Sequence, residues 1–459
     1  MKFLKVFKEI WEMEELRDRI LYTLLMIGIF RLGAHVVLPG VDAIKLAAMV
    51  GNSSQEGSPL GLLDMFSGGA FNRASIFALG IMPYITASIV IQLMGMTVPY
   101  FQKLQKEGES GRRELNNITR SLTILVCIAQ SFGYITFLRY SYSSAIVDEM
   151  PALIFSASTI IVLTSCTVFL MWLGEKITDK GIGNGISLLI MIGIIASLPT
   201  EFLNELKNKG MYSSESGPQL LPFLIEMIIL FGIFLVSIAL IQAIRRIPVN
   251  YAKKVMSGES VVGGTREYIP LKVNAAGVMP IIFAQALMFL PGMMGQFVPE
   301  SMESMSGLMA SFSDFTSVPY NITQFILVIL FTYFYTAILF NPKQMSDDLK
   351  KSNAFIPGVR PGTDTANFID KIMSRILLPG SIFLGLITII PGIAAELGVQ
   401  RGFAYFFGGT SLLILVGVVL DTIQQIDSYL LMRHYDSLSR TGRKRPRQNN
   451  SPISTPSAL

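Results

Sequence analysis

The chain has 459 residues, of which 51% are hydrophobic and only 15% are charged, and its net charge is +5. Soluble domains carry about 25% charged residues, so this composition excludes an ordinary soluble protein and indicates a membrane protein. The two cysteines, Cys127 and Cys166, lie in apolar segments, and the two histidines, His35 and His434, lie far apart. Neither pair predicts a disulfide framework or a metal cluster. The sequence has no phosphate-binding loop, zinc-ligand spacing or nucleophile elbow, so we expect neither an enzyme nor a cofactor.

The chain begins with a mixed-charge segment, residues 1–19, in which Phe3, Phe7 and Trp11 share one helix face. This pattern predicts a helix that lies at the cytoplasmic membrane surface. Ten apolar segments follow, each close to the roughly 20 residues that cross a bilayer. The predicted spans are 20–38, 74–98, 119–138, 152–173, 182–198, 220–242, 273–293, 319–341, 372–394 and 403–423. The sequence therefore predicts an all-α membrane protein with ten transmembrane helices.

Positive charges orient these spans. With the N-terminus in the cytoplasm, 30 of the 37 Lys and Arg residues fall in segments on the cytoplasmic side. Acidic residues are spread more evenly, as the positive-inside rule allows. Residues 243–272 and 342–371 become long basic cytoplasmic loops, and residues 426–459 a basic cytoplasmic tail with a disordered end. An even number of spans places both termini in the cytoplasm.

Two short strings recur along the chain. ALGIMPYI at 78–85 resembles AAGVMPII at 275–282, and GISLLI at 185–190 resembles GTSLLI at 409–414. Each pair falls at the same place in two sets of five spans. Because five is odd, the second set has the opposite polarity, which indicates an inverted repeat with a working site near the midplane. We predict two inverted five-helix halves around a central pore, at residues 20–200 and 220–425, joined by an outer hinge loop at 201–219.

Four isoleucines fall at similar depth in different spans. At 1.5 Å per residue, Ile85, Ile190, Ile282 and Ile414 lie about 12–16 Å inside the membrane, near the middle of a roughly 30 Å hydrocarbon core. Ile81 and Ile186 lie one turn away on the same faces. These side chains could form an apolar constriction that excludes water. Periodicity alone fits ordinary packing residues of a bundle better, so both interpretations stay open.

The segment before the second predicted span, residues 60–74, is too short and too interrupted to cross the membrane. It contains Gly68-Gly69 and three polar residues, Asp64, Asn72 and Arg73. Irregular backbone at membrane depth is tolerated only where protein buries it or where it lines a cavity. The segment is therefore either an outer loop or a re-entrant half-helix that could close a passage just outside the isoleucines.

Polar residues inside the predicted spans are almost all neutral, namely Gln92, Gln130, Asn184, Asn274 and Gln285, whereas Arg31, Glu226 and Asp421 lie toward span ends. Neutral polar groups in lipid commonly form hydrogen bonds between helices. Gln92 and Asn274 belong to the second and seventh spans, which the repeat relates. A contact between these two amides would be either a reversible latch or a static interhelical bond.

Several longer strings resemble the SecY family of protein-conducting channel subunits. The resemblance extends from about residue 15 to 435, and the strings follow the order found in the family. They are FRLG at 30–33, PGVD at 39–42, FSGGA at 66–70, IQL at 91–93, GIGNGIS at 181–187, RRIPVNYAK at 245–253, PLKVN at 270–274, PGVRPG at 357–362 and FGGTSLLI at 407–414. The loops at 255–268 and 294–318 depart from the family pattern.

The resemblance implies a channel in the cytoplasmic membrane that passes unfolded secretory proteins and releases apolar segments sideways into lipid. Its pore ring would comprise Ile81, Ile85, Ile186, Ile190, Ile282 and Ile414. Its plug would occupy residues 60–73, including Leu62, Asp64, Phe66, Ser67, Gly68 and Gly69. Gln92 and Asn274 would belong to the lateral gate, which lies between the second and third spans on one side and the seventh and eighth on the other.

The resemblance also implies partners. Arg245, Arg246, Lys253, Lys254 and Arg360 match basic positions that dock the SecA motor or the ribosome. The expected partners are the SecE and SecG subunits, SecA, the ribosome, signal-bearing polypeptides and anionic lipid. The expected channel hydrolyses nothing itself, so its motor or the ribosome would give transport its direction.

Two other functions fit part of the pattern. A secondary transporter explains an inverted repeat equally well, but it usually carries ionisable groups inside its spans, and this sequence has almost none there. A structural scaffold for other membrane proteins would not explain four isoleucines at one depth.

Overall fold

The computed structural model describes residues 10–52, 64–147, 151–211, 220–251, 254–255, 261–262, 266–295, 311–312 and 314–441. Several expectations lie outside these residues: residues 1–9 of the helix predicted at 1–19, the plug residue Leu62, the basic residue Lys253, most of the loop at 294–318 and the end of the tail.

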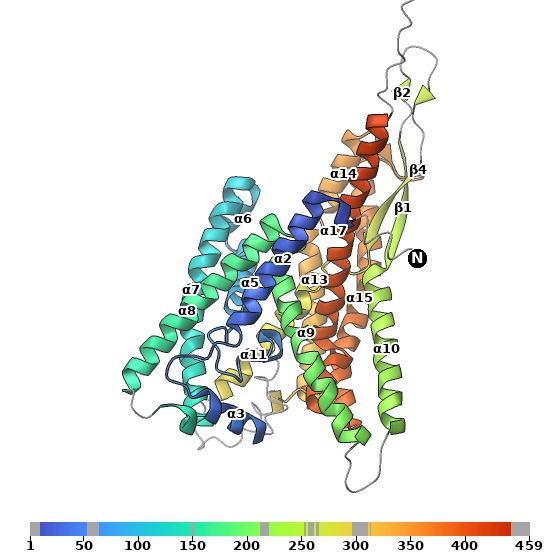
Figure 1. Ribbon diagram of the computed structural model, residues 1–459. Helices are drawn as coiled ribbons and strands as arrows, with labels where there is room; N and C mark the ends of the chain where they lie inside the picture. Colours follow the sequence, from blue (N-terminus) through green and yellow to red (C-terminus); the bar gives the residue numbers. More distant parts are fainter. Residues whose placement is uncertain are drawn as a thin grey trace, which may run out of the picture.

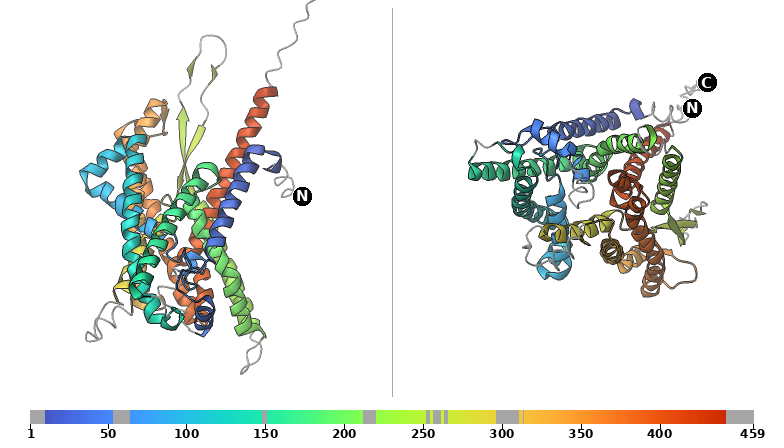
Figure 2. Two further views of the ribbon diagram at one scale, coloured as in Figure 1. Left: turned by 60° about the vertical axis from the view of Figure 1, so that its left-hand side comes forward. Right: turned by 90° about the horizontal axis from the view of Figure 1, so that it is seen from below.

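Long helices run alongside one another through the molecule (Figure 1). The first part of the chain forms α2 (Glu14–Gly33), α3 (Ala43–Asn52), α5 (Met82–Thr97), α6 (Pro99–Lys106), α7 (Glu109–Ser141), the short η1 (Ser143–Ala145), α8 (Ala152–Lys180) and α9 (Gly185–Leu206). The second part forms the π-helical turn η2 (Lys207–Met211), α10 (Leu220–Gln242), α11 (Met279–Gly295), α13 (Val318–Leu339), α14 (Pro342–Lys351), α15 (Thr363–Glu396), α16 (Arg401–Ala404), η3 (Tyr405–Phe407) and α17 (Gly409–Thr441). Seen from below, α11 lies between α5 and α7 on one side and α15 and α17 on the other (Figure 2).

Seven helices in the described part of the chain are long and apolar enough to cross a membrane. An eighth is added if α5 and α6, which are bent by 99° relative to each other, form one span. The apolar part of α11, Met279–Met288, is shorter, and α2 carries charged residues near both of its ends, including Arg17 and Arg31. These lengths confirm a mostly helical, multi-pass membrane protein, whereas the count of ten spans stays a prediction.

The second and seventh predicted spans begin later than expected. Residues 74–81 and 273–278 form turns, so the prediction that helix runs through them is wrong. Gly80 and Gly277 have φ values of +55° and +65°, which favour glycine and end any regular helix there. Pro83 and Pro280 then fall in the first turns of α5 and α11. A backbone N–H there has no partner within the helix, so proline, which has no N–H, costs no hydrogen bond. The two prolines therefore start helices rather than bend them.

The loop predicted at 243–272 contains β-structure, so the all-α prediction is wrong there. Strand β1 (Ile244–Tyr251) pairs antiparallel with β4 (Arg266–Lys272) and with β5 (Ala354–Phe355), and a second pair joins β2 (Lys254–Val255) to β3 (Val261–Val262). Successive side chains of a strand point to opposite faces of the sheet. Along β1, Ile247 and Val249 are therefore buried while Pro248 is exposed. The buried residues pack in one cluster with Ile369 and Met373 of α15. The sheet thus rests on the same end of the molecule as α14 (Figure 1).

A buried ion cluster joins the end of α9 to the second part of the chain. Glu205 has no exposed surface, and its carboxylate accepts a hydrogen bond from the Gln400 backbone N–H at 3.0 Å. Lys209 lies 2.9 Å from Glu205 and also pairs with Glu226 of α10. The chain is helical as far as Met211, so the predicted hinge loop at 201–219 begins as a helix. The cluster fixes this corner to α10 and to the turn before α16.

Replacing Glu205 by Ala should therefore destabilise the protein, because Lys209 and the Gln400 N–H lose a buried partner. Removing one member of a buried pair costs about 3–5 kcal/mol. The matched control is Glu109→Ala, whose partner Arg113 lies at 2.8 Å with both side chains exposed; exposed pairs contribute about 1 kcal/mol or less. The free energy of unfolding in detergent measures both, and equal losses would contradict a structural role for the buried cluster.

Candidate functional site

The six predicted ring isoleucines come from four helices and one turn. Ile81 lies in the turn before α5, Ile85 lies on α5, Ile186 and Ile190 lie on α9, and the last two are Ile282 on α11 and Ile414 on α17. Five of them are buried in one apolar cluster, with exposed fractions of 1–8%. Ile186 is half-buried and packs against the same cluster. All six residues thus belong to or pack against one large apolar cluster, although they are up to 333 positions apart in the sequence.

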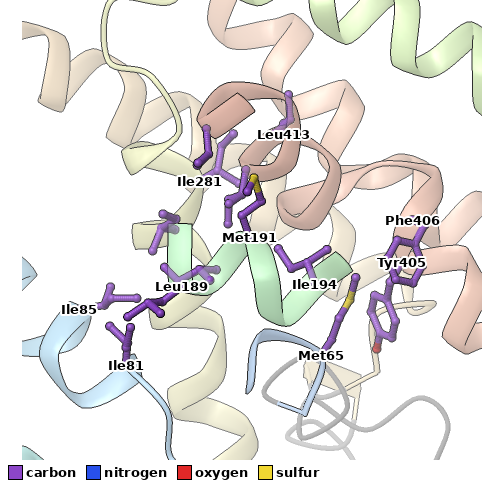
Figure 3. Packing of buried hydrophobic residues seen from close by; sticks show 14 of the residues in the cluster. Met65, Ile81, Ile85, Leu189, Met191, Ile194, Ile281, Tyr405, Phe406 and Leu413 are labelled. Carbon is purple, nitrogen blue, oxygen red and sulfur yellow. The ribbon is translucent and has the colours of Figure 1, made fainter. Parts of the chain in front are cut away.

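The cluster closes tightly around a small cavity. Ile81, Ile85 and Ile190 line it together with Leu189, Phe30 and Phe66, and Figure 3 shows Ile81 and Ile85 next to Leu189. Its volume of about 10 Å³ leaves room for at most about one water molecule. Helix α11 contacts both α5 and α17, and α17 contacts α9. Three of the six predicted ring residues thus line a narrow, mostly apolar constriction.

The segment Asp64–Ala74 folds back on itself beside this constriction. After a short helical stretch at 64–67, Gly68 and Gly69 adopt φ values of +69° and +82°. The Ser67 hydroxyl donates to the Asp64 carbonyl at 2.9 Å and accepts from the Phe71 N–H at 3.1 Å. The Asp64 carboxylate accepts from the Asn72 N–H at 2.8 Å. Local hydrogen bonds thus satisfy a backbone that forms no regular helix.

Protein surrounds this segment. Met65 is 5% exposed and belongs to the same apolar cluster as the isoleucines. Phe71 packs against Tyr134 of α7, whose hydroxyl donates to the Phe71 carbonyl at 2.8 Å. Of the two sequence interpretations, an exposed outer loop does not describe these residues, because they pack inside the helices as irregular backbone at membrane depth must.

The two candidate gate residues, Gln92 on α5 and Asn274 before α11, have different polar surroundings. The Gln92 amide donates to Ser88 of its own helix at 3.2 Å. Asn274 is buried, and its side-chain carbonyl has no hydrogen-bond partner among the described residues. Asn274 lies in the turn before α11 instead of on the helix, which changes the direction in which its side chain leaves the backbone. Among the described residues the structure thus shows no hydrogen bond from Gln92 to the Asn274 carbonyl, although α5 and α11 contact each other.

A buried amide network joins the helices of the second part of the chain. Gln285 of α11 donates to the Tyr320 hydroxyl and accepts from Gln324 and Thr410, each at 3.1 Å. The sequence identified Gln285 as a polar residue within a span, but it gave no signal for partners 35–125 residues away. The network fixes α11 against α13 and the start of α17, and so positions two of the ring helices.

Three of the five predicted docking residues, Arg245, Arg246 and Arg360, are fully described by the structure. Arg245 and Arg246 are exposed on β1, and Arg360 is exposed in the turn between Gly358 and Gly362. The structure describes neither Lys253 nor the side chain of Lys254. Nearby, the Glu267 carboxylate on β4 raises the pKa of the Tyr251 hydroxyl, because its charge and a hydrogen bond disfavour the phenolate. The described basic residues thus face solvent from two separate elements.

Comparison with known proteins places this geometry in a family. The SecY family model matches residues 75–423. The protein translocase subunit SecY of Streptomyces scabiei is 41% identical, over 95% of this chain and 100% of that protein. That of Aquifex aeolicus is 40% identical, over 94% and 99%.

Solved structures agree in fold. A structure described as that of a protein conducting channel aligns with a TM-score of 0.61 at 16% identity, covering 94% of this chain and 95% of that one. A SecY structure whose plug domain is described as stabilising the closed channel aligns at 0.57, with 17% identity and the same coverage. Sec61 in the canine ribosome–channel complex also aligns at 0.57, with 15% identity and the same coverage. The chain belongs to the SecY family of protein translocase subunits.

Proposed function

We propose that unfolded polypeptides cross this protein translocation channel through the ring formed by Ile81, Ile85, Ile186, Ile190, Ile282 and Ile414. The observation that carries the proposal is the convergence of these side chains, from α5, α9, α11 and α17, in one buried cluster beside the folded-back segment Asp64–Ala74. A ring of apolar side chains excludes water when empty. It also offers no fixed hydrogen-bond partner, so it can close around chains of different size and sequence.

The proposed architecture has two inverted halves of five spans each, at residues 20–200 and 220–425, with both termini in the cytoplasm and the pore between the halves. The paired turns before α5 and α11 support it, because each has a glycine of positive φ followed by a proline in the first helical turn. The basic sheet end then faces the cytoplasm, as the positive-inside rule requires, and the protein lies in the cytoplasmic membrane.

The proposed plug comprises residues 60–73, and the proposed lateral gate lies between α5 and α11. Apolar segments leave the pore between these helices because burial in lipid removes their surface from water. Asn274 supports this assignment, since its buried carbonyl has no partner among the residues that the structure describes and would gain one from the backbone of an arriving segment. Gln92 lies on the facing helix α5.

The proposed docking surface for the SecA motor or the ribosome comprises Arg245, Arg246, Lys253, Lys254 and Arg360. Exposed arginines on β1 and on the turn at 358–362 suit the phosphates of ribosomal RNA or an acidic protein surface. The further proposed partners are SecE, SecG and anionic lipid. The exposed apolar faces of the helices suit the two subunits, and the exposed arginines suit the lipid.

The ring is tested by replacing Ile85, Ile190, Ile282 and Ile414 together with Asn and measuring ion conductance across vesicles that contain the purified protein. Amides hold water in the constriction, so the resting conductance should rise several-fold. Replacement of the same four residues by Val is the control, because it keeps the lining apolar, and it should leak far less. Unchanged conductance together with unchanged secretion would reject the ring.

The gate is tested by a disulfide between cysteines placed at facing positions of α5 and α11, after Cys127 and Cys166 have been replaced by Ala. The crosslink should stop the export of signal-bearing chains, because α5 can no longer separate from α11, and reduction should restore it. Normal export through fully crosslinked channels would remove the gate from this position.

The docking surface is tested by Arg360→Glu. Charge reversal should weaken motor binding and lower the export rate several-fold, whereas resting conductance and the amount of folded protein should not change. Lys45→Glu is the control, because Lys45 is an exposed residue of α3 at the opposite end of the molecule (Figure 1). Full export by the Arg360 variant would exclude a docking role for this residue.

A further inference from the structure

The segment Asp64–Ala74 touches α9 backbone to backbone at one glycine. A Cβ atom built on Gly193 would lie 2.2 Å from the Phe66 carbonyl oxygen and 3.3 Å from the Gly68 nitrogen. Both atoms belong to the backbone, so no side-chain rotation relieves the overlap. Next to it, Ile194 of α9 lies beside Met65 of the same segment (Figure 3). Only a residue without a side chain fits at position 193 while the segment keeps this place.

Two arginines approach the Gly68 carbonyl. Arg31 of α2 and Arg73 each direct a guanidinium nitrogen to the Gly68 carbonyl, at 3.4 Å. A Cβ built on Gly68 would lie 2.4 Å from the Arg31 nitrogen and 3.2 Å from the Cα atom of Gly193. The backbone of α9 and the side chain of Arg31, which belongs to a separate helix, thus both lie against Gly68.

We propose that Gly193 and Arg31 form a plug seat: Gly193 sets how closely the plug approaches α9, and Arg31 holds the Gly68 carbonyl in that position. The inference rests on the proposed function, since it needs residues 60–73 to act as the plug of a channel. It assigns roles to two residues that lie outside both the pore ring and the plug. Neither touches the translocating chain, so both are positioning residues.

The composition of α9 supports this role. Glycine lowers the stability of a helix interior relative to alanine, and Gly193 lies in the middle of α9 (Gly185–Leu206). Its contact with the plug offsets that disadvantage. The hold by Arg31 is long for a hydrogen bond, so it positions the plug without fixing it permanently, as a segment that must be displaced during transport requires.

The test compares Gly193→Ala with the matched control Gly232→Ala in the full-length protein in vesicles. A Cβ on Gly232 of α10 meets no atom within 4 Å. If the seat is correct, Gly193→Ala raises the resting ion conductance about tenfold, equivalent to about 1.4 kcal/mol, while the control does not. The thermal midpoint of the Gly193 variant should not fall in parallel with the increased leak, because alanine favours the helix itself.

A second arm combines Gly193→Ala with deletion of residues 60–69. Two changes that act through one element are not additive, so Gly193→Ala should add no leak to a channel that lacks the plug. An equal added leak in that background would show that Gly193 acts elsewhere and would overturn the seat. If the deletion alone leaves conductance unchanged, the plug assignment itself fails. If the deletion raises the resting conductance but Gly193→Ala does not, the plug assignment stands and only the proposed role of Gly193 is rejected.

Arg31 is tested in the same assay with Arg31→Met and Arg31→Lys. Methionine keeps much of the length of arginine but cannot donate to the Gly68 carbonyl, so the leak should rise, again without an added effect in the deletion background. Lysine restores a donor and should recover much of the seal. Equal leaks from the two variants would contradict a role for Arg31 as a donor to the plug.

Discussion

Isoleucine side chains from α5, α9, α11 and α17 pack into one apolar cluster. The positions of these side chains depend on the turns and polar contacts that hold the four helices. Side chains this far apart in sequence meet only if four helices begin and end at suitable depths. The turns at Gly80 and Gly277 set the start of α5 and α11, so that Ile85 and Ile282 each fall within the first turn or so of their helices. The turn at Gly80 also places Ile81 against the small cavity that Phe66 and Ser67 line.

Polar contacts elsewhere hold the helices in this arrangement without entering the constriction. The amide network around Gln285 fixes α11 to α13 and α17. Asn184 caps α9 by accepting from the Ser187 N–H, and the neighbouring Gly183 N–H donates to Gln425 of α17. The ions around Glu205 close the far end of α9. Each contact is buried or lies at a helix end, where an unpaired polar group would be costly. These contacts position the helices, so the isoleucine side chains themselves need no polar partners.

The sequence was sufficient to predict the membrane class and most of the helices, because apolar periodicity acts over long stretches. The ring of six isoleucines came from the family resemblance, since periodicity alone fitted ordinary packing better, and it stays a prediction. It could not locate the start of α5, since a proline within an apolar run fits a kink as well as a first turn. The strand β1 was missed because IRRIPVNY is short and rich in charge.

Contacts between distant residues were harder still. The partners of Gln285, the pairing of Glu205 with Lys209 and Glu226, and the approach of Gly193 to the plug depend on how helices pack, which no local pattern encodes. Sequence also placed Asn274 on a helix, whereas it lies in the turn before α11. Sequence patterns thus indicated which segments are apolar, whereas packing decides which side chains touch.

The most direct test of the channel follows a stalled secretory chain. A photoreactive amino acid is placed in turn at Ile85, Ile190, Ile282 and Ile414, and at Ile228 on the exposed face of α10 as a control. A chain held midway through export should crosslink to all four ring positions and not to Ile228. Crosslinks that avoid the ring, while export continues, would contradict a pore at the isoleucine cluster.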